Sequence, residues 1–224
     1  MSRVHVIVEG PSEESFVNEV LSPELSRRGV YLYPQLIGRP GHKGGIRPYS
    51  SAKRDILISL KQDRHAFCTT MFDYYGMPDT WPGVSEVKGK PFHLISSTIE
   101  SSIYKDIGAA MGDAYNASQF MPYVQMHEFE ALLFSDIAKL RYCYPGEDAA
   151  ITALVGQAAK FESPEMINDS RDTAPSKRIE KEIKDYQKVI AGSVTALEIS
   201  LPVLRSKCQH FNEWVTKLEA LGTG

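Results

Sequence analysis

The 224-residue chain has few cysteines, no long apolar run and little net charge. Its three cysteines are far apart and form no CxxC pair, so neither a disulfide framework nor a zinc motif is expected. No stretch approaches the roughly 18 apolar residues of a membrane span, and the first residues enter a strand pattern without room for a signal peptide. These absences predict a cytoplasmic protein with reduced thiols and no membrane partner.

The net charge is only −3, but the charged residues are unevenly distributed along the chain. Residues 25–54 contain seven Lys or Arg side chains and no Asp or Glu. The glycine-rich stretch GRPGHKGGIRPY within this segment carries Lys43 and Arg47. Such a segment suits an anionic ligand such as phosphate, although a solvated basic loop has the same composition.

Apolar patterns in the first half alternate between strand and helix periods. Strand-like runs are predicted at residues 4–8, 30–37, 66–72 and 91–96, and helices at 12–22, 51–63 and around 99–107. One more strand is expected at 120–125, followed by helices that include one through Ile179 and Ile190 and a last one through Phe211 and Leu218. This order predicts an α/β fold with a mainly parallel sheet of about four strands, sandwiched by helices. Residues 1–120 would form the core, and 121–224 a mainly helical extension that packs on it and completes the site.

Two acids follow predicted strands directly. Glu9 ends the first strand in VIVEGPSEESFV, and Asp73 ends the third in AFCTTMFD. Parallel strands present their carboxyl ends at one edge, where ligands bind in open α/β sheets. Paired carboxylates there form a hard-oxygen site for Mg²⁺ or Mn²⁺, unless each acid merely caps the helix that follows.

The strand that ends in VEG, with two acids three to four residues later, resembles the first motif of Toprim domains, which are Rossmann-like. The resemblance covers residues 1–110 and implies that Glu9 is a general acid or base and Asp73 a Mg²⁺ ligand. Toprim domains carry a second aspartate where this chain has Tyr75 in FDYYG. Asp79 could return to the site, or another acid could replace the missing one. Glu13 would favour the start of its helix and could approach the metal.

The second half contributes two further motifs. QMHEFEALLFSD places His127, Glu128 and Glu130 after a strand, as candidates for the missing ligand or as an acid-rich helix start. In DTAPSKRIEKEI, Lys177 and Arg178 follow a helix start, where free backbone N–H groups favour phosphate. Lys177 and Arg178 are equally typical of ordinary basic residues on a charged surface helix. Together, VEGxSE, HEFEALLFSD and APSKRI resemble a Toprim-like bacterial family of unknown function.

Acids that hold metal ions and cations that hold phosphates are the two requirements of phosphodiester chemistry. The expected function is metal-dependent phosphoryl transfer, as a nuclease acting on DNA or RNA. Glu9 and Asp73 would be catalytic, Glu128 and Glu130 would complete the metal site, and Lys43, Arg47, Lys177 and Arg178 would bind phosphates. Kinship with overcoming-lysogenization-defect nucleases implies a role in phage defence and a co-encoded ATPase partner. A degenerate Toprim module that binds without cleaving, or a nucleotide phosphohydrolase, are the alternatives.

Overall fold

The structure is a computed structural model that describes residues 1–39, 42–43, 48–167 and 173–222. Its main sheet contains β1 (Ser2–Val8), β2 (Val30–Leu36), β5 (Phe67–Asp73), β6 (Phe120–Met121) and β7 (Val124–Gln125). The strands are parallel in the order β2-β1-β5-β6, and β7 pairs with β5 farther along that strand. The short strands β3 (Gly38–Arg39) and β4 (His42–Lys43) form a separate antiparallel pair.

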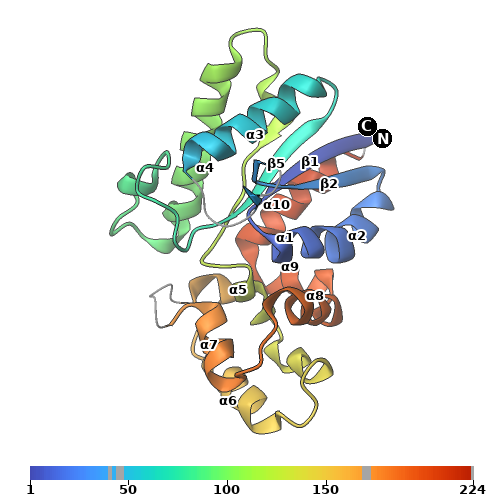
Figure 1. Ribbon diagram of the computed structural model, residues 1–224, viewed down its shortest axis with the longest axis vertical. Coiled ribbons are helices and arrows are strands. Elements are labelled where there is room, and N and C mark those ends of the chain that lie inside the picture. Colours follow the sequence, from blue (N-terminus) through green and yellow to red (C-terminus); the bar gives the residue numbers. More distant parts are fainter. Residues whose placement is uncertain (40–41, 44–47, 168–172, 223–224) are drawn as a thin grey trace.

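Side chains of β1 alternate between two cores, because successive residues of a strand point to opposite faces. Val4, Val6 and Val8 pack with α1 (Pro11–Phe16), η1 (Val17–Leu21) and α2 (Ser22–Ser26). Ile7 packs with α3 (Tyr49–Gln62) and α4 (Phe92–Met111) on the opposite face. Figure 1 shows these two helical layers on either side of the sheet. The predicted α/β class, with a mainly parallel sheet between helices, is confirmed.

The chain after β7 is mainly helical. Its elements are α5 (Glu130–Leu133), η4 (Ile137–Tyr142), α6 (Asp148–Ala158), η5 (Pro164–Met166), α7 (Pro175–Glu182), α8 (Lys188–Ile199), α9 (Leu201–Lys207) and α10 (Gln209–Ala220). Two short 3-10 turns, η2 (Val84–Glu86) and η3 (Ala117–Gln119), lie earlier in the chain. In Figure 1, α6 and α7 lie away from the sheet, while α8, α9 and α10 lie closer to it.

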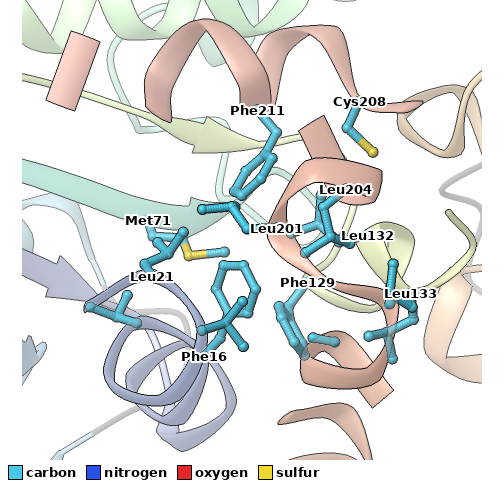
Figure 2. Packing of buried hydrophobic residues seen from close by; sticks show 14 of the residues in the cluster. Phe16, Leu21, Met71, Phe129, Leu132, Leu133, Leu201, Leu204, Cys208 and Phe211 are labelled. Atoms are coloured by element: carbon cyan, nitrogen blue, oxygen red, sulfur yellow. The ribbon is translucent and has the colours of Figure 1, made fainter. Parts of the chain in front are cut away.

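An aromatic core joins the helical second half to the sheet. The ring centroid of Phe16 in α1 lies 5.2 Å from that of Phe129 and 5.9 Å from that of Phe211. Figure 2 shows the three side chains in this core. Trp214 of α10 donates a hydrogen bond of 2.8 Å from Nε1 to Oγ1 of Thr69 in β5. The two halves therefore share one hydrophobic cluster, and β6 spans the boundary placed after residue 120.

Three predicted elements were wrong in type or extent. Residues 91–96 begin α4 instead of forming a strand, since Pro91 precedes the first turn and a short apolar run has no distinctive period. The strand predicted at 120–125 is interrupted between β6 and β7 at Pro122, which has no N–H for a sheet ladder. The single helix expected through Ile179 and Ile190 is two, because the chain becomes extended at Ile183.

Within the described ranges, no single helix is long and apolar enough to cross a membrane. Only the pair α8 and α9, taken together across an 87° bend, passes that test of length and composition.

Gly192→Ala is expected to lower the free energy of unfolding by about 1 kcal/mol, because α8 packs closely on the residues before α5. A Cβ at position 192 would lie 3.0 Å from Cε1 of Phe129. Gly156 of α6 is the matched control: nothing lies within 4 Å of its Cβ position, so alanine there gains about 1 kcal/mol of helix propensity. Thermal melts of both variants test this. Equal stabilisation at the two positions would contradict it.

Candidate functional site

The structure brings Glu9 and Asp73 to the same edge of the sheet. Glu9 follows β1 and Asp73 ends β5, and these strands are parallel neighbours with Val8 opposite Met71. The backbone N–H of Asp73 donates a hydrogen bond of 3.3 Å to Oε2 of Glu9. Asp73 is buried, and in the described part of the chain its Oδ1 has no hydrogen-bond partner. This edge therefore holds a buried carboxylate with an oxygen available to a ligand.

Glu13 joins these two acids from the first turn of α1. Its side chain is buried, and its Oε2 lies 3.0 Å from the Cβ position of a side chain at Gly10. A larger residue at position 10 would displace the carboxylate. Glycine at position 10 thus leaves room for the carboxylate of Glu13 beside the end of β1. Besides favouring the helix dipole, Glu13 interacts electrostatically with Glu9 and Asp73.

Glu128 and His127 lie in the turn between β7 and α5. His127 has a φ of 65°, a left-handed conformation that is uncommon outside glycine, and its carbonyl accepts a 2.8 Å hydrogen bond from the N–H of Tyr75. This bond ties the turn to the residues after β5. Glu128 is buried, and its Oε2 accepts a 2.9 Å hydrogen bond from the N–H of Ser176 at the start of α7. Free backbone N–H groups were expected at the start of α7 as phosphate donors. The N–H of Ser176 is not free, because it donates to Glu128.

Glu130 is fully buried and pairs with Lys188, the first residue of α8. Oε2 of Glu130 lies 2.9 Å from Nζ of Lys188, whose side chain is 41% exposed. Within the described residues, Oε1 of Glu130 has no hydrogen-bond partner. The buried carboxylate of Glu130 therefore pairs with a lysine, Lys188, that is partly accessible to solvent.

Lys188 is the residue of this site that sequence reasoning missed. Its charge favours the ionised forms of Glu9, Glu13, Asp73 and Glu130. Burial alone would lower the pKa of Lys188, but Glu130 and Asp73 raise it above its ordinary value. No signal in the sequence indicated it, because Lys188 fell inside the single helix expected through Ile179 and Ile190.

We call the group Glu9, Glu13, Asp73, Glu128 and Glu130 the acidic site. Burial, followed by the charge of Glu13, raises the pKa of Glu9 to about 7. Burial and the charges of Glu13 and Glu9 raise the pKa of Asp73 well above its ordinary value. Burial also raises the pKa of Glu130 to about 7, although Lys188 opposes the shift. Carboxyl groups that retain protons near neutral pH are typical of functional sites.

Tyr75 and Asp79 follow Asp73 in the chain, and neither supplies a carboxylate to the site. Tyr75 is half-buried in the turn after β5, where the Toprim resemblance implies a carboxylate. Asp79 pairs with Lys88 at 2.6 Å, and both side chains are more than 60% exposed. The idea that Asp79 returns to the site is therefore not supported, and Glu13, Glu128 and Glu130 are the acids that accompany Glu9 and Asp73.

Of the two predicted phosphate-binding residues in α7, Lys177 interacts with the acidic site and Arg178 is held by other contacts. Lys177 is half-exposed, pairs with Glu180 at 2.6 Å, and interacts electrostatically with Glu128 and Tyr75. Arg178 instead donates from Nε to the carbonyl of Thr173 at 2.7 Å and lies 5.4 Å above the ring of Phe161. Of the candidates in the basic segment, Arg47 and the side chain of Lys43 lie outside the described residues.

The oxygen donors of the acidic site fit a hard divalent cation by their chemistry. Asp73, whose Oδ1 is buried and unpaired among the described residues, and the half-buried Glu9 are the residues that would hold it. Within the described ranges, no three His, Cys, Asp or Glu side chains are arranged as a ready metal site. Ligands would have to move together when a cation binds.

The fold and the site define an α/β protein with buried acids and a lysine at the carboxyl edge of a parallel sheet. The chain belongs to the family described as Domain of unknown function (DUF4276), whose model matches residues 8–219 and includes the whole acidic site. A search among curated proteins finds no match. Among solved structures, the C-terminal region of the Burkholderia pseudomallei OLD protein is similar, with a TM-score of 0.48 and 13% identity, over all of both chains.

Proposed function

We propose that the protein is a Toprim-type, metal-dependent phosphoryl-transfer enzyme that cleaves nucleic acid. The observation that carries this proposal is the meeting of Glu9 and Asp73 at the carboxyl edge of β1 and β5, with Oδ1 of Asp73 buried and unpaired among the described residues. Unpaired carboxylate oxygen is costly to bury, and a cation ligand would offset that cost. The VEG motif and the position of Asp73 supply the Toprim part of the proposal.

Each residue of the site has a role in this reaction. Bound Mg²⁺ or Mn²⁺ would supply charge stabilisation for the phosphoryl oxygens and lower the pKa of a nucleophilic water. Asp73 would be the principal ligand. The Toprim resemblance implies that Glu9 is the general acid or base, and burial raises its pKa to about 7 in the metal-free protein. Lys188 and Lys177 are the solvent-accessible cations beside the acids, so they would contact phosphate oxygens.

The helical second half completes this site in the proposal. Glu128, Glu130, Lys177 and Lys188 all lie after β7, so the α/β core alone would lack the cations and two of the acids. A nucleic-acid substrate, a co-encoded ATPase partner and a role in phage defence follow from the resemblance to overcoming-lysogenization-defect nucleases. They belong to the proposal on that ground alone.

A cleavage assay tests the proposal. Purified protein is incubated with supercoiled plasmid, single-stranded DNA and RNA in the presence of EDTA, Mg²⁺ or Mn²⁺, with and without a co-encoded ATPase where one exists. Metal-dependent cleavage of a polymer is the expected result. Turnover of free nucleotides alone would favour a phosphohydrolase. No turnover of any substrate under any condition would overturn the proposal.

A binding module without catalysis is the second candidate, and one observation favours it. Tyr75 occupies the position of a metal-binding carboxylate in Toprim domains, and its N–H is used to hold the His127 turn. In this alternative the acidic site would serve only to organise the fold. Binding of nucleic acid or of a partner ATPase by the wild-type protein, without cleavage under any metal condition, would support it.

Lys177→Gln is expected to weaken nucleic-acid binding and to reduce the salt dependence of the affinity by about one released counterion. The reason is that Lys177 is half-exposed and lies close enough to Glu128 to interact with it electrostatically. Lys181→Gln, an exposed lysine of the same helix, is the control and should bind as wild type. Fluorescence anisotropy of labelled DNA and RNA at several salt concentrations measures both. Equal losses in both variants would contradict a specific contact.

A further inference from the structure

The acids of the acidic site fall into two groups according to their partners. Glu128 accepts the N–H of Ser176, and Glu130 pairs with Lys188, so both already have direct partners within the protein. Among the described residues, no lysine or arginine forms an ion pair with Glu9, Glu13 or Asp73. Glu128 and Glu130 therefore each have an oxygen that a protein group contacts, whereas Oδ1 of Asp73 is buried without a partner among the described residues.

We propose that this site binds one divalent cation, at Glu9 and Asp73, and that the ammonium of Lys188 takes the place of a second cation at Glu130. The proposal rests on the proposed function, because it names how that site holds its metal. It departs from the arrangement in which all four acids, Glu9, Asp73, Glu128 and Glu130, act as ligands.

Electrostatics decides between one cation and two. A divalent ion and an ammonium group repel each other, and the repulsion is strong where little solvent separates them. Lys188 lies 2.9 Å from Glu130, so a second ion bound by Glu130 would have to displace it. Oε2 of Glu128 already accepts the hydrogen bond from the N–H of Ser176.

The burial of Glu130 explains why Lys188 is tolerated at the acidic site. Glu130 is 0% exposed, and a buried carboxylate without a cation would be costly. Tyr75 cannot supply the negative charge that a second divalent ion would need. Lys188 provides a single positive charge that matches Glu130 and leaves Asp73 with its unpaired oxygen for the one divalent ion.

Counting bound ions tests the proposal independently of activity. Isothermal titration calorimetry with MnCl₂, checked by electron paramagnetic resonance of free Mn²⁺, should give one ion per chain for the wild type. Lys188→Met should raise the number to two, whereas Lys188→Arg, which keeps the charge, should leave it at one. Lys184→Met is the control for removing a nearby exposed lysine and should also give one.

A double variant guards against misfolding and identifies the second set of ligands. Lys188→Met with Glu130→Gln removes both charges of the buried ion pair and should return to one ion, with circular dichroism confirming the fold. Two ions in the wild type would overturn the inference and leave the proposed enzyme intact. One ion in Lys188→Met would overturn the part assigned to Lys188. No binding at all would overturn both this inference and the proposed function, whereas one ion without cleavage would overturn only the latter.

Discussion

Asp73→Asn is expected to reduce metal-dependent cleavage by about 10³-fold, which corresponds to about 4 kcal/mol of lost transition-state stabilisation. Asparagine keeps the shape of the side chain and removes the charge that would bind the cation. The same change should leave the metal-free protein as stable as the wild type or more stable, because Asp73 is buried with an unpaired Oδ1 and a raised pKa. A loss of activity without a loss of stability is the mark of a residue kept for function.

Asp79→Asn is the matched control for Asp73→Asn. Asp79 lies six residues later in an exposed ion pair with Lys88, so its charge should matter little to cleavage or to stability. Initial rates on a plasmid or RNA substrate and thermal melts in EDTA measure both properties for each variant. Full activity in Asp73→Asn would show that the cleaving site lies elsewhere. A large loss in Asp79→Asn would place a ligand where the structure shows a surface pair.

The parts of the fold that followed from the sequence are those set by local pattern. Residues 4–8 and 66–72 read as buried strands because β-branched and apolar residues fill runs of five to seven positions bounded by turns. Residues 91–96 also contain an apolar run but begin a helix that starts after Pro91, and the isoleucines that follow, from Ile99 to Ile107, are buried against the sheet. Tertiary packing of that longer helix decided the element.

The site was predictable to the extent that sheet topology determines it. Glu9 and Asp73 follow parallel strands, so their meeting required only that β1 and β5 be neighbours. Lys188 reaches the site from a helix that returns to it after residues 131–187, and no spacing in the sequence encodes that return. Likewise, the use of the Ser176 N–H by Glu128 depends on the approach of α7 to the β7 turn. Contacts of this kind come from the packing of the helical half, which the sequence does not specify locally.

The thermal stability of the metal-free protein is expected to fall as the pH rises from 5.5 to 8. Glu9 and Glu130 have folded-state pKa values of about 7, against 4.5 for the ordinary carboxyl. Between these values the folded protein holds protons that the unfolded chain has lost, so a rising pH favours unfolding. The loss should be on the order of 2 kcal/mol for each group and about 4 kcal/mol for both, or roughly 10 °C in melting temperature. Added Mn²⁺ should restore stability at pH 8, because it binds the ionised carboxylates of the folded state.

Glu9→Gln combined with Glu130→Gln is the variant that isolates this effect. It should flatten part of the slope, and the slope that is left would report on Asp73 and His210. Burial alone would lower the pKa of His210, but its hydrogen bond to Glu100 raises it, so its stabilising charge is also lost as the pH rises. Melts in EDTA at half-unit steps of pH measure both proteins. A wild-type melting temperature that rises from pH 5.5 to 8 would contradict the raised pKa values. An unchanged slope in the double variant would assign the effect to His210 and the other buried groups.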